Sequence, residues 1–183
     1  MTDEYQPVRF SLDEAQVAAD GWFNCGPGAL CAVANLRPEE ALPHLRGFER
    51  KHYTNPAMMQ GALASLGIPF ERIYECLGIG KARNPVFPCF GLVRVQWSGP
   101  WTAPGVPVRA RYRHTHWVAW DSDNRLVFDV NAMCVGGWIS EAEWRDEMVP
   151  WLLRHIDPKA DSEWWPTHCW EIKRGVSTVS LCH

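Results

Sequence analysis

The sequence lacks long apolar runs and blocks of charge of one sign. It contains no apolar stretch of the roughly 20 residues that a membrane-spanning helix requires. Residues 1–20 are polar, without the apolar core of a signal peptide. The formal net charge is −3 and no block of Lys or Arg occurs, so the chain carries no electrostatic footprint for nucleic acid. We therefore expect neither a membrane span nor a nucleic-acid partner.

The seven cysteines follow neither a disulfide framework nor a metal-binding spacing. Their number is odd, and no Cys-x-x-Cys or Cys/His pattern of a zinc site is present. Unpaired thiols are typical of a reducing compartment. We therefore expect a cytoplasmic protein that holds no metal and no cofactor.

A chain of 183 residues is long enough to bury one sizeable core. We expect a single domain, residues 1–183, with a helical half at about 10–67 and a sheet half at about 68–183. The chain has 11 tryptophans, which is a high number. Six of them lie in the last quarter and predict dense aromatic packing there: Trp138, Trp144, Trp151, Trp164, Trp165 and Trp170.

The first 67 residues have mainly helical patterns. A helix is expected at residues 25–36, where an apolar run, Ala29 to Leu36, follows a polar, glycine-flanked turn. A second helix is expected from Pro38, because proline fits the first helical turn. A third is expected at residues 56–67, where apolar residues recur with a period of 3.6 and Gly67 ends the pattern. A short helix is also possible within residues 12–19.

The remainder is dominated by strand patterns separated by turns. A helix is expected at residues 140–155, where Ser140 begins a capping-box spacing. Residues 98–107 and 157–166 are expected to be loops. The predicted strands are residues 68–73, 90–97, 115–120, 125–130 and 167–173. Helices followed by an antiparallel sheet with one late helix predict an α+β fold.

Cys25 stands at the start of the apolar helix predicted at residues 25–36. Pro27 is compatible with the first turn of this helix, so the thiol lies near the helix N-terminus. Unpaired N–H groups and the helix dipole stabilise an anion there, and such positions lower a thiol pKa. Cys25 is therefore a candidate nucleophile. The alternative is a buried cysteine that only begins a core helix, as we expect for Cys31.

A nucleophilic thiol needs a base and a group that orients the base. His116 lies in one predicted strand and Asp129 in the next. A hairpin turn centred between residues 122 and 123 would place them directly opposite each other, on one face of the sheet. The alternatives are His114 as the base and Asn131 as the orienting group.

These residues resemble a known superfamily. The segment Asn-Cys-Gly-Pro-Gly-Ala-Leu at residues 24–30, His-Trp-Val-Ala at 116–119 and Phe-Asp-Val-Asn at 128–131 are similar to motifs of papain-like cysteine peptidases. Within that superfamily the likeness is greatest to bacteriocin-processing peptidases that cleave double-glycine leaders. It covers roughly residues 15–135. The resemblance implies a helical half and a sheet half with the active cleft between them.

The resemblance also implies residue roles. Cys25 is the nucleophile, His116 the base and acid, and Asp129 the orienting group. The family usually has an oxyanion-hole glutamine six residues before the cysteine, where this chain has Ala19. We expect Gln16 to fill that role. Asn24 is a second polar candidate nearer to the thiol.

Three functions are compatible with these residues. The first is a cysteine hydrolase that cleaves a peptide or isopeptide bond in a peptide or protein substrate. The second is a papain-like acyltransferase of the transglutaminase-like or phytochelatin-synthase-like kind. The third is an inactive papain-like binding module, for example a phage-associated one. Four tryptophans are candidates for lining a substrate cleft, with core or loop packing as their alternative role: Trp22, Trp97, Trp101 and Trp117.

Overall fold

The computed structural model describes residues 24–76, 84–107, 110, 114–132, 135–156, 159–161 and 163–173. The helix predicted within residues 12–19, and the candidate residues Gln16 and Trp22, lie outside these ranges. Over the described ranges, no helix has the length and apolar character needed to cross a bilayer.

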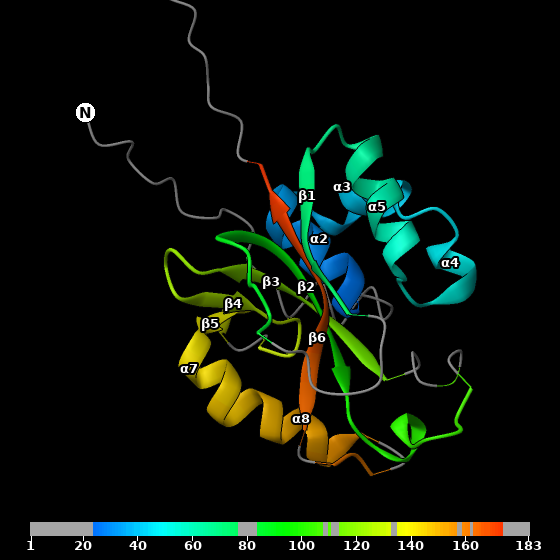
Figure 1. Cartoon of the computed structure of the whole chain (residues 1–183). Helices are drawn as coiled ribbons and strands as arrows, with labels where there is room; N and C mark the ends of the chain where they lie inside the picture. The colour runs from blue at the N-terminus through cyan, green and yellow to red at the C-terminus, as the bar shows by residue number, and fades with distance from the viewer. Residues whose placement is uncertain are drawn as a thin grey trace, which may run out of the picture.

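The structure is an α+β arrangement built on one six-stranded antiparallel sheet (Figure 1). The strands are arranged in the order β1-β6-β2-β3-β4-β5. Their bounds are β1 (Phe70–Glu75), β2 (Phe90–Trp97), β3 (Thr115–Asp121), β4 (Leu126–Phe128), β5 (Trp138–Ser140) and β6 (Trp164–Ile172). The α+β class and the strand predicted at residues 90–97 are thus confirmed.

The helices precede and follow most of the strands. The early ones are α2 (Cys25–Ala34), α3 (Pro38–Ala41), η1 (Leu42–His44), α4 (Phe48–Lys51) and α5 (Pro56–Ser65). A short turn, η2 (Pro100–Thr102), follows β2. The late helix consists of α7 (Glu141–Glu143), a π-helical turn η4 (Trp144–Met148) and α8 (Val149–His155). Its N-cap is Ser140, whose hydroxyl accepts from the Glu143 N–H at 3.1 Å, as the sequence predicts.

The two groups of helices pack on opposite faces of the sheet. Alternate residues of β2 divide between two hydrophobic clusters: Leu92 belongs to the cluster built on α2 and α5. Val93 belongs to the cluster that contains Trp144 and Leu153 of the late helix. Because successive side chains of a strand point to opposite faces, each cluster fills one face. β2 is buried along its whole length.

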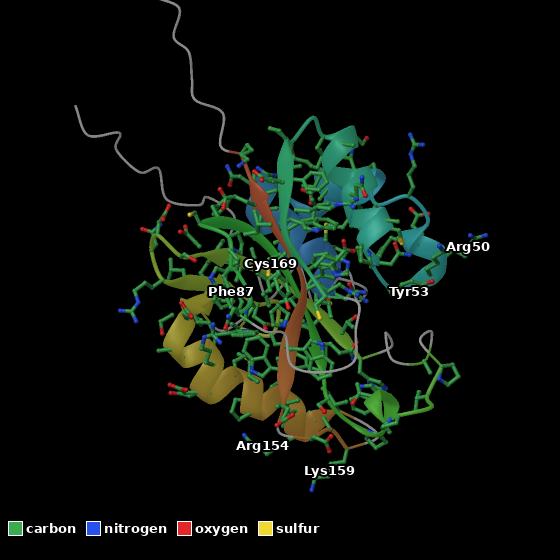
Figure 2. The ribbon with its side chains drawn as sticks, in the orientation of Figure 1. Arg50, Tyr53, Phe87, Arg154, Lys159 and Cys169 are labelled. Atoms are coloured by element: carbon green, nitrogen blue, oxygen red, sulfur yellow. The ribbon has the colours of Figure 1, made fainter. Side chains whose placement is uncertain are left out.

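Most charged side chains of the described residues lie on the outer surface of these layers, and Arg94, Asp121 and Asp129 are buried exceptions. Arg50, Arg154 and Lys159 are exposed, whereas Cys169 of β6 is fully buried (Figure 2). Tyr53 is a large exposed ring, just before α5. The division follows the cost of burying unpaired charge and the gain from burying apolar surface.

Several strands differ from expectation. β1 lies two residues later than the predicted strand at 68–73, and β4 ends at Phe128, two residues before the predicted end. β5 was not predicted, and β6 begins at Trp164, so the expected loop at residues 157–166 is wrong over its last residues. The register between β2 and β6 shifts at Arg94 and Val95, and Pro166 pairs there with Val95. Proline, which cannot donate to a ladder, is tolerated next to such an irregularity.

A glycine in the central strand allows β2 and β6 to approach closely. A Cβ atom on Gly91 would lie 1.9 Å from the Trp170 carbonyl oxygen, so a larger residue forces the two backbones apart. Gly61 of α5 has no heavy atom within 4 Å of its virtual Cβ and is exposed.

We predict that Gly91→Ala lowers the free energy of unfolding by about 1–3 kcal/mol, the usual cost of overpacking. Gly61→Ala is the matched control and should raise it by about 0.5–1 kcal/mol, because alanine stabilises helix interiors. Urea unfolding followed by tryptophan fluorescence measures both. Equal stabilities for Gly91→Ala and the wild type would contradict the close strand contact.

Candidate active site

Cys25 is the first residue of α2, directly after the helix cap. The cap is Asn24, whose side-chain oxygen accepts from the Gly26 N–H at 3.2 Å. Its amide donates to the His52 carbonyl at 3.1 Å. The N–H of Cys25 has no acceptor within its own helix, because the first four N–H groups of an α-helix have none. The thiol therefore lies beside its own backbone N–H, which has no acceptor within the helix, and at the positive end of the helix dipole.

The sulfur of Cys25 reaches β3 at a place where the sheet has an open edge. β4 pairs with β3 only over three residues, ending at Phe128 opposite Ala119. The Trp97 N–H donates to the His114 carbonyl. The backbone N–H and C=O groups of His114 and of every second residue after it therefore point toward β2. The N–H of Trp117 consequently points to the other edge. There it donates to the thiol of Cys25.

The imidazole of His116 connects Cys25 to Asp129. Its Nε2 lies 2.9 Å from Oδ2 of Asp129, and its ring forms a side-chain hydrogen bond with the Cys25 thiol. Because Nε2 is engaged by the carboxylate, Nδ1 is the nitrogen left for the sulfur. His116 is 7% and Asp129 0% exposed, whereas Cys25 retains partial exposure. The structure therefore brings all three predicted residues together.

The predicted register of the hairpin is wrong by two residues. Trp120 pairs with Val127, because the turn runs to Arg125, which adopts a positive φ of 56°. Asp129 is therefore diagonal to His116, not directly opposite, and lies just beyond the end of β4. The contact still forms because a shift of two residues keeps every side chain on its face.

Four donors surround the Asp129 carboxylate. Its Oδ1 accepts from the backbone N–H of Asn131 at 2.9 Å and from the Asn131 amide at 2.8 Å. Its Oδ2 accepts from His116 and from the indole Nε1–H of Trp144 at 2.8 Å. Asn131, the alternative orienting residue, thus supports Asp129 in this structure. Sequence reasoning missed Trp144, because nothing in its local pattern points to residue 129.

The three groups shift one another's pKa values. Burial alone would raise the pKa of the Cys25 thiol, but the charge and hydrogen bond of His116 and the Trp117 N–H lower it. Burial disfavours the His116 imidazolium, but Asp129 and Cys25 raise its pKa well above the ordinary value. Burial also opposes the Asp129 carboxylate, yet His116 and its other donors lower its pKa to about 2. The arrangement favours a thiolate–imidazolium pair.

The other predicted site residues have structural contacts. His114, the alternative base, stacks on Trp101 with ring centroids 3.7 Å apart. Trp97 stacks on His116 at 5.8 Å and its carbonyl accepts from the Trp101 indole at 2.8 Å. The Trp117 indole donates to a backbone carbonyl of the helical layer at 2.9 Å. These three tryptophans are buried, so packing accounts for most of their surface.

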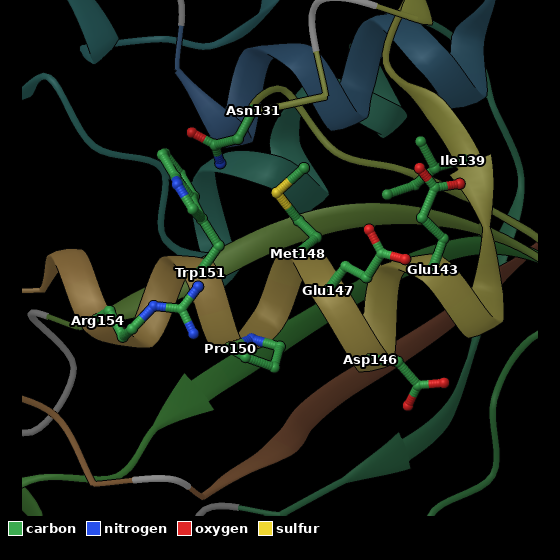
Figure 3. A pocket seen from close by; sticks show the side chains of 9 residues that line it. All are labelled: Asn131, Ile139, Glu143, Asp146, Glu147, Met148, Pro150, Trp151 and Arg154. Atoms are coloured by element: carbon green, nitrogen blue, oxygen red, sulfur yellow. The ribbon is translucent and has the colours of Figure 1, made fainter.

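A hollow adjoins the carboxylate end of the site. It has a volume of about 540 Å³ and lies between Asn131 and the outer side of the late helix (Figure 3). In this view the ring of Trp151 and the side chain of Met148 point toward Asn131. The lining residues are Asn131, Ile139, Glu143, Asp146, Glu147, Met148, Pro150, Trp151 and Arg154. Asn131 is common to this hollow and to the hydrogen bonds of Asp129.

Comparisons of the chain with models of protein families, with curated proteins and with solved structures found no match. Among the described residues, no three His, Cys, Asp or Glu side chains are grouped so that they could hold a metal ion. A functional interpretation therefore depends on the chemistry of the Cys25, His116 and Asp129 side chains.

We predict that iodoacetamide modifies Cys25 with a pH midpoint below 9.0, the ordinary thiol pKa. Cys31, on the same helix, is buried with a pKa raised to about 12 and should remain unmodified. In His116→Ala, burial remains while the imidazolium is lost. The rate of Cys25 alkylation at neutral pH should then fall at least about tenfold, which corresponds to a rise of about one unit in the thiol pKa. Peptide mass mapping separates the two thiols, and coincident profiles for wild type and His116→Ala would disprove the pairing.

We also predict an acid-sensitive contribution of Asp129 to stability. The pKa of Asp129 is about 2 in the fold, against an ordinary 3.8. The ionised carboxylate therefore stabilises the fold fully at pH values above that ordinary pKa. This contribution is lost as the pH falls from about 4 to about 2. The wild type should therefore lose more stability over this interval than Asp129→Asn, which does not titrate. Urea unfolding at several acid pH values tests this, and parallel losses would argue against it.

Proposed function

We propose that this chain is a papain-like cysteine hydrolase that cleaves an amide bond in a peptide or isopeptide substrate. The observation that carries the proposal is the single imidazole that contacts both a thiol and a buried carboxylate. A nucleophile, a base and a group that orients the base are what acyl transfer from an amide requires. Their order in the chain, with the thiol first, supports the papain-like interpretation.

In the first half of the proposed reaction, the Cys25 thiolate attacks the carbonyl carbon of the substrate. A sulfur–carbon bond forms and the carbonyl electrons move to oxygen, giving an oxyanion. The Cys25 N–H at the start of α2 is placed to donate to it. When the carbon–nitrogen bond breaks, His116 gives its proton to the leaving amine. A thioester on Cys25 remains.

In the second half, neutral His116 takes a proton from water, and the oxygen of that water attacks the thioester carbon. The carbon–sulfur bond then breaks, and the carboxylic acid product leaves. The thiolate and the imidazolium are restored. Asp129 stays ionised throughout and stabilises the imidazolium each time it forms.

Two structural features support the proposed placement of the substrate. Cys25 keeps partial exposure as a residue while His116 and Asp129 are buried, an order of exposure that suits a nucleophile in front of its base and acid. The oxyanion donor proposed among the described residues is the Cys25 backbone N–H, which remains when the side chain is changed to alanine. Gln16, the expected second donor, lies outside the described residues and remains part of the proposal.

We predict turnover of blocked peptides that carry a fluorogenic amine leaving group. Cys25→Ala should abolish it, and Asp129→Asn should lower kcat by about 10²- to 10⁴-fold, because the imidazolium loses its partner. Asp121→Asn is the matched control: Asp121 is also fully buried and also bonded to an asparagine, Asn124. It should retain activity within about twofold, since no such bond orients the base.

The products distinguish the three functions. Release of free acid in water supports the hydrolase. Preferential transfer of the acyl group to an added amine would support an acyltransferase instead of the hydrolase. Absence of any acyl adduct on Cys25 by intact mass, across a diverse peptide library, would overturn the enzymatic proposal in favour of a binding module.

A further inference from the structure

The geometry points to Trp144 as a positioning residue that fixes the Asp129 carboxylate for His116. This inference depends on the proposed function, in which Asp129 orients the base. It also gives the tryptophan-rich C-terminal part a role at the site, although that part lies beyond the stretch that resembles a peptidase.

The donors are divided evenly between the two oxygens of Asp129. Asn131 supplies both donors to Oδ1. Oδ2 is shared by His116 and Trp144 at 2.9 and 2.8 Å. A carboxylate held only at Oδ1 can rotate and carry Oδ2 away from the imidazole. The Trp144 N–H prevents that rotation because it fixes the oxygen that His116 uses.

A local distortion of the late helix places Trp144 toward the site. The Val149 N–H donates to the Trp144 carbonyl, five residues earlier, so one π-helical turn separates them. Trp144, Val149 and Leu153 are all buried against the sheet. In a regular α-helix the residue four positions after Trp144 would share its face. With the wider turn, Met148 lines the hollow beside Asn131 and is only partly buried against the cluster that contains Trp144.

Neighbouring rings hold the Trp144 indole in one orientation. Trp120 and Trp164 meet it edge-to-face, with centroids 5.8 and 5.1 Å away and interplanar angles of 84° in both cases. Such arrangements are favoured by the charge distribution of aromatic rings. The guanidinium of Arg145 lies over both Trp120 and Trp164, 5.2 and 5.3 Å from their centroids. The indole donor is therefore preorganised, and its side chain is fully buried.

Loss of this donor has a consequence for the thiol. With Oδ2 no longer fixed, the imidazolium of His116 has a weaker partner and gives up its proton more readily. The thiolate of Cys25 then loses part of its stabilising charge. We therefore expect its titration to move to higher pH, while the contacts of the substrate with the rest of the cleft stay the same.

The test compares Trp144→Phe in the full chain with benzothienylalanine at position 120, which keeps the Trp120 ring against Trp144 and has sulfur in place of the N–H. Both remove one indole N–H from the same cluster, but the Trp120 N–H bonds the Ser122 hydroxyl at 3.1 Å. In Trp144→Phe the midpoint of Cys25 alkylation should rise by about one pH unit and kcat should fall about tenfold with KM unchanged. Such a factor is typical of a hydrogen bond to a charged group. Benzothienylalanine at position 120 should keep the wild-type midpoint.

A second variant covers the case in which Trp144→Phe does not fold. Benzothienylalanine at position 144 keeps the shape of the indole but has sulfur in place of the N–H, and it should give the same shift. A wild-type alkylation profile in either folded Trp144 variant would overturn the inference, provided that Asp129→Asn shifts the profile. If Asp129→Asn also leaves it unchanged, the carboxylate does not act on the base and both proposals fail. Alkylation needs no substrate, so an absence of peptide turnover alone would overturn only the hydrolase.

Discussion

The site depends on the early end of β4. This strand pairs with β3 for three residues only. The chain then leaves β3 but stays beside β5, with the Asp129 N–H bonded to the Gly137 carbonyl at 2.8 Å. The short pairing leaves the outer N–H of Trp117 free to meet the thiol of Cys25. It also brings Asp129 out of the strand and onto the imidazole of His116. A longer β4 would fill the edge that the start of α2 now occupies.

Burying a charged pair at this edge is tolerated because every charge has a partner. Removing an ion from water costs several kcal/mol unless hydrogen bonds replace the lost solvation. Asp129 has four donors, and His116 has an acceptor on one side and sulfur on the other. Residues far apart in sequence supply these groups, so the fold must be complete before the charges are stable.

Local patterns were sufficient to predict much of the fold and to select Cys25, His116 and Asp129, which the structure brings together. Pro27 in the first turn of α2, the period of 3.6 in α5, the strand pattern of β2 and the spacing after Ser140 each predict their element. Short-range signals could not predict β5 or the start of β6, because three-residue pairing and a proline beside a bulge depend on neighbouring strands. The hydrogen bond from the Trp144 indole to Asp129 could not be predicted either, since it depends on the packing of the late helix against the sheet.

Trp117 is part of both layers at once. Its main chain belongs to β3 and donates to the Cys25 sulfur, while its indole donates to the Thr54 carbonyl at 2.9 Å in the helical layer. A Cβ atom on Gly26 would lie 2.2 Å from the Thr54 hydroxyl oxygen, so that layer also packs tightly against the start of α2. Sliding of one layer past the other would break these links together. The thiol and the imidazole are consequently held together by the fold itself, and the proposed reaction needs no closing motion to assemble them.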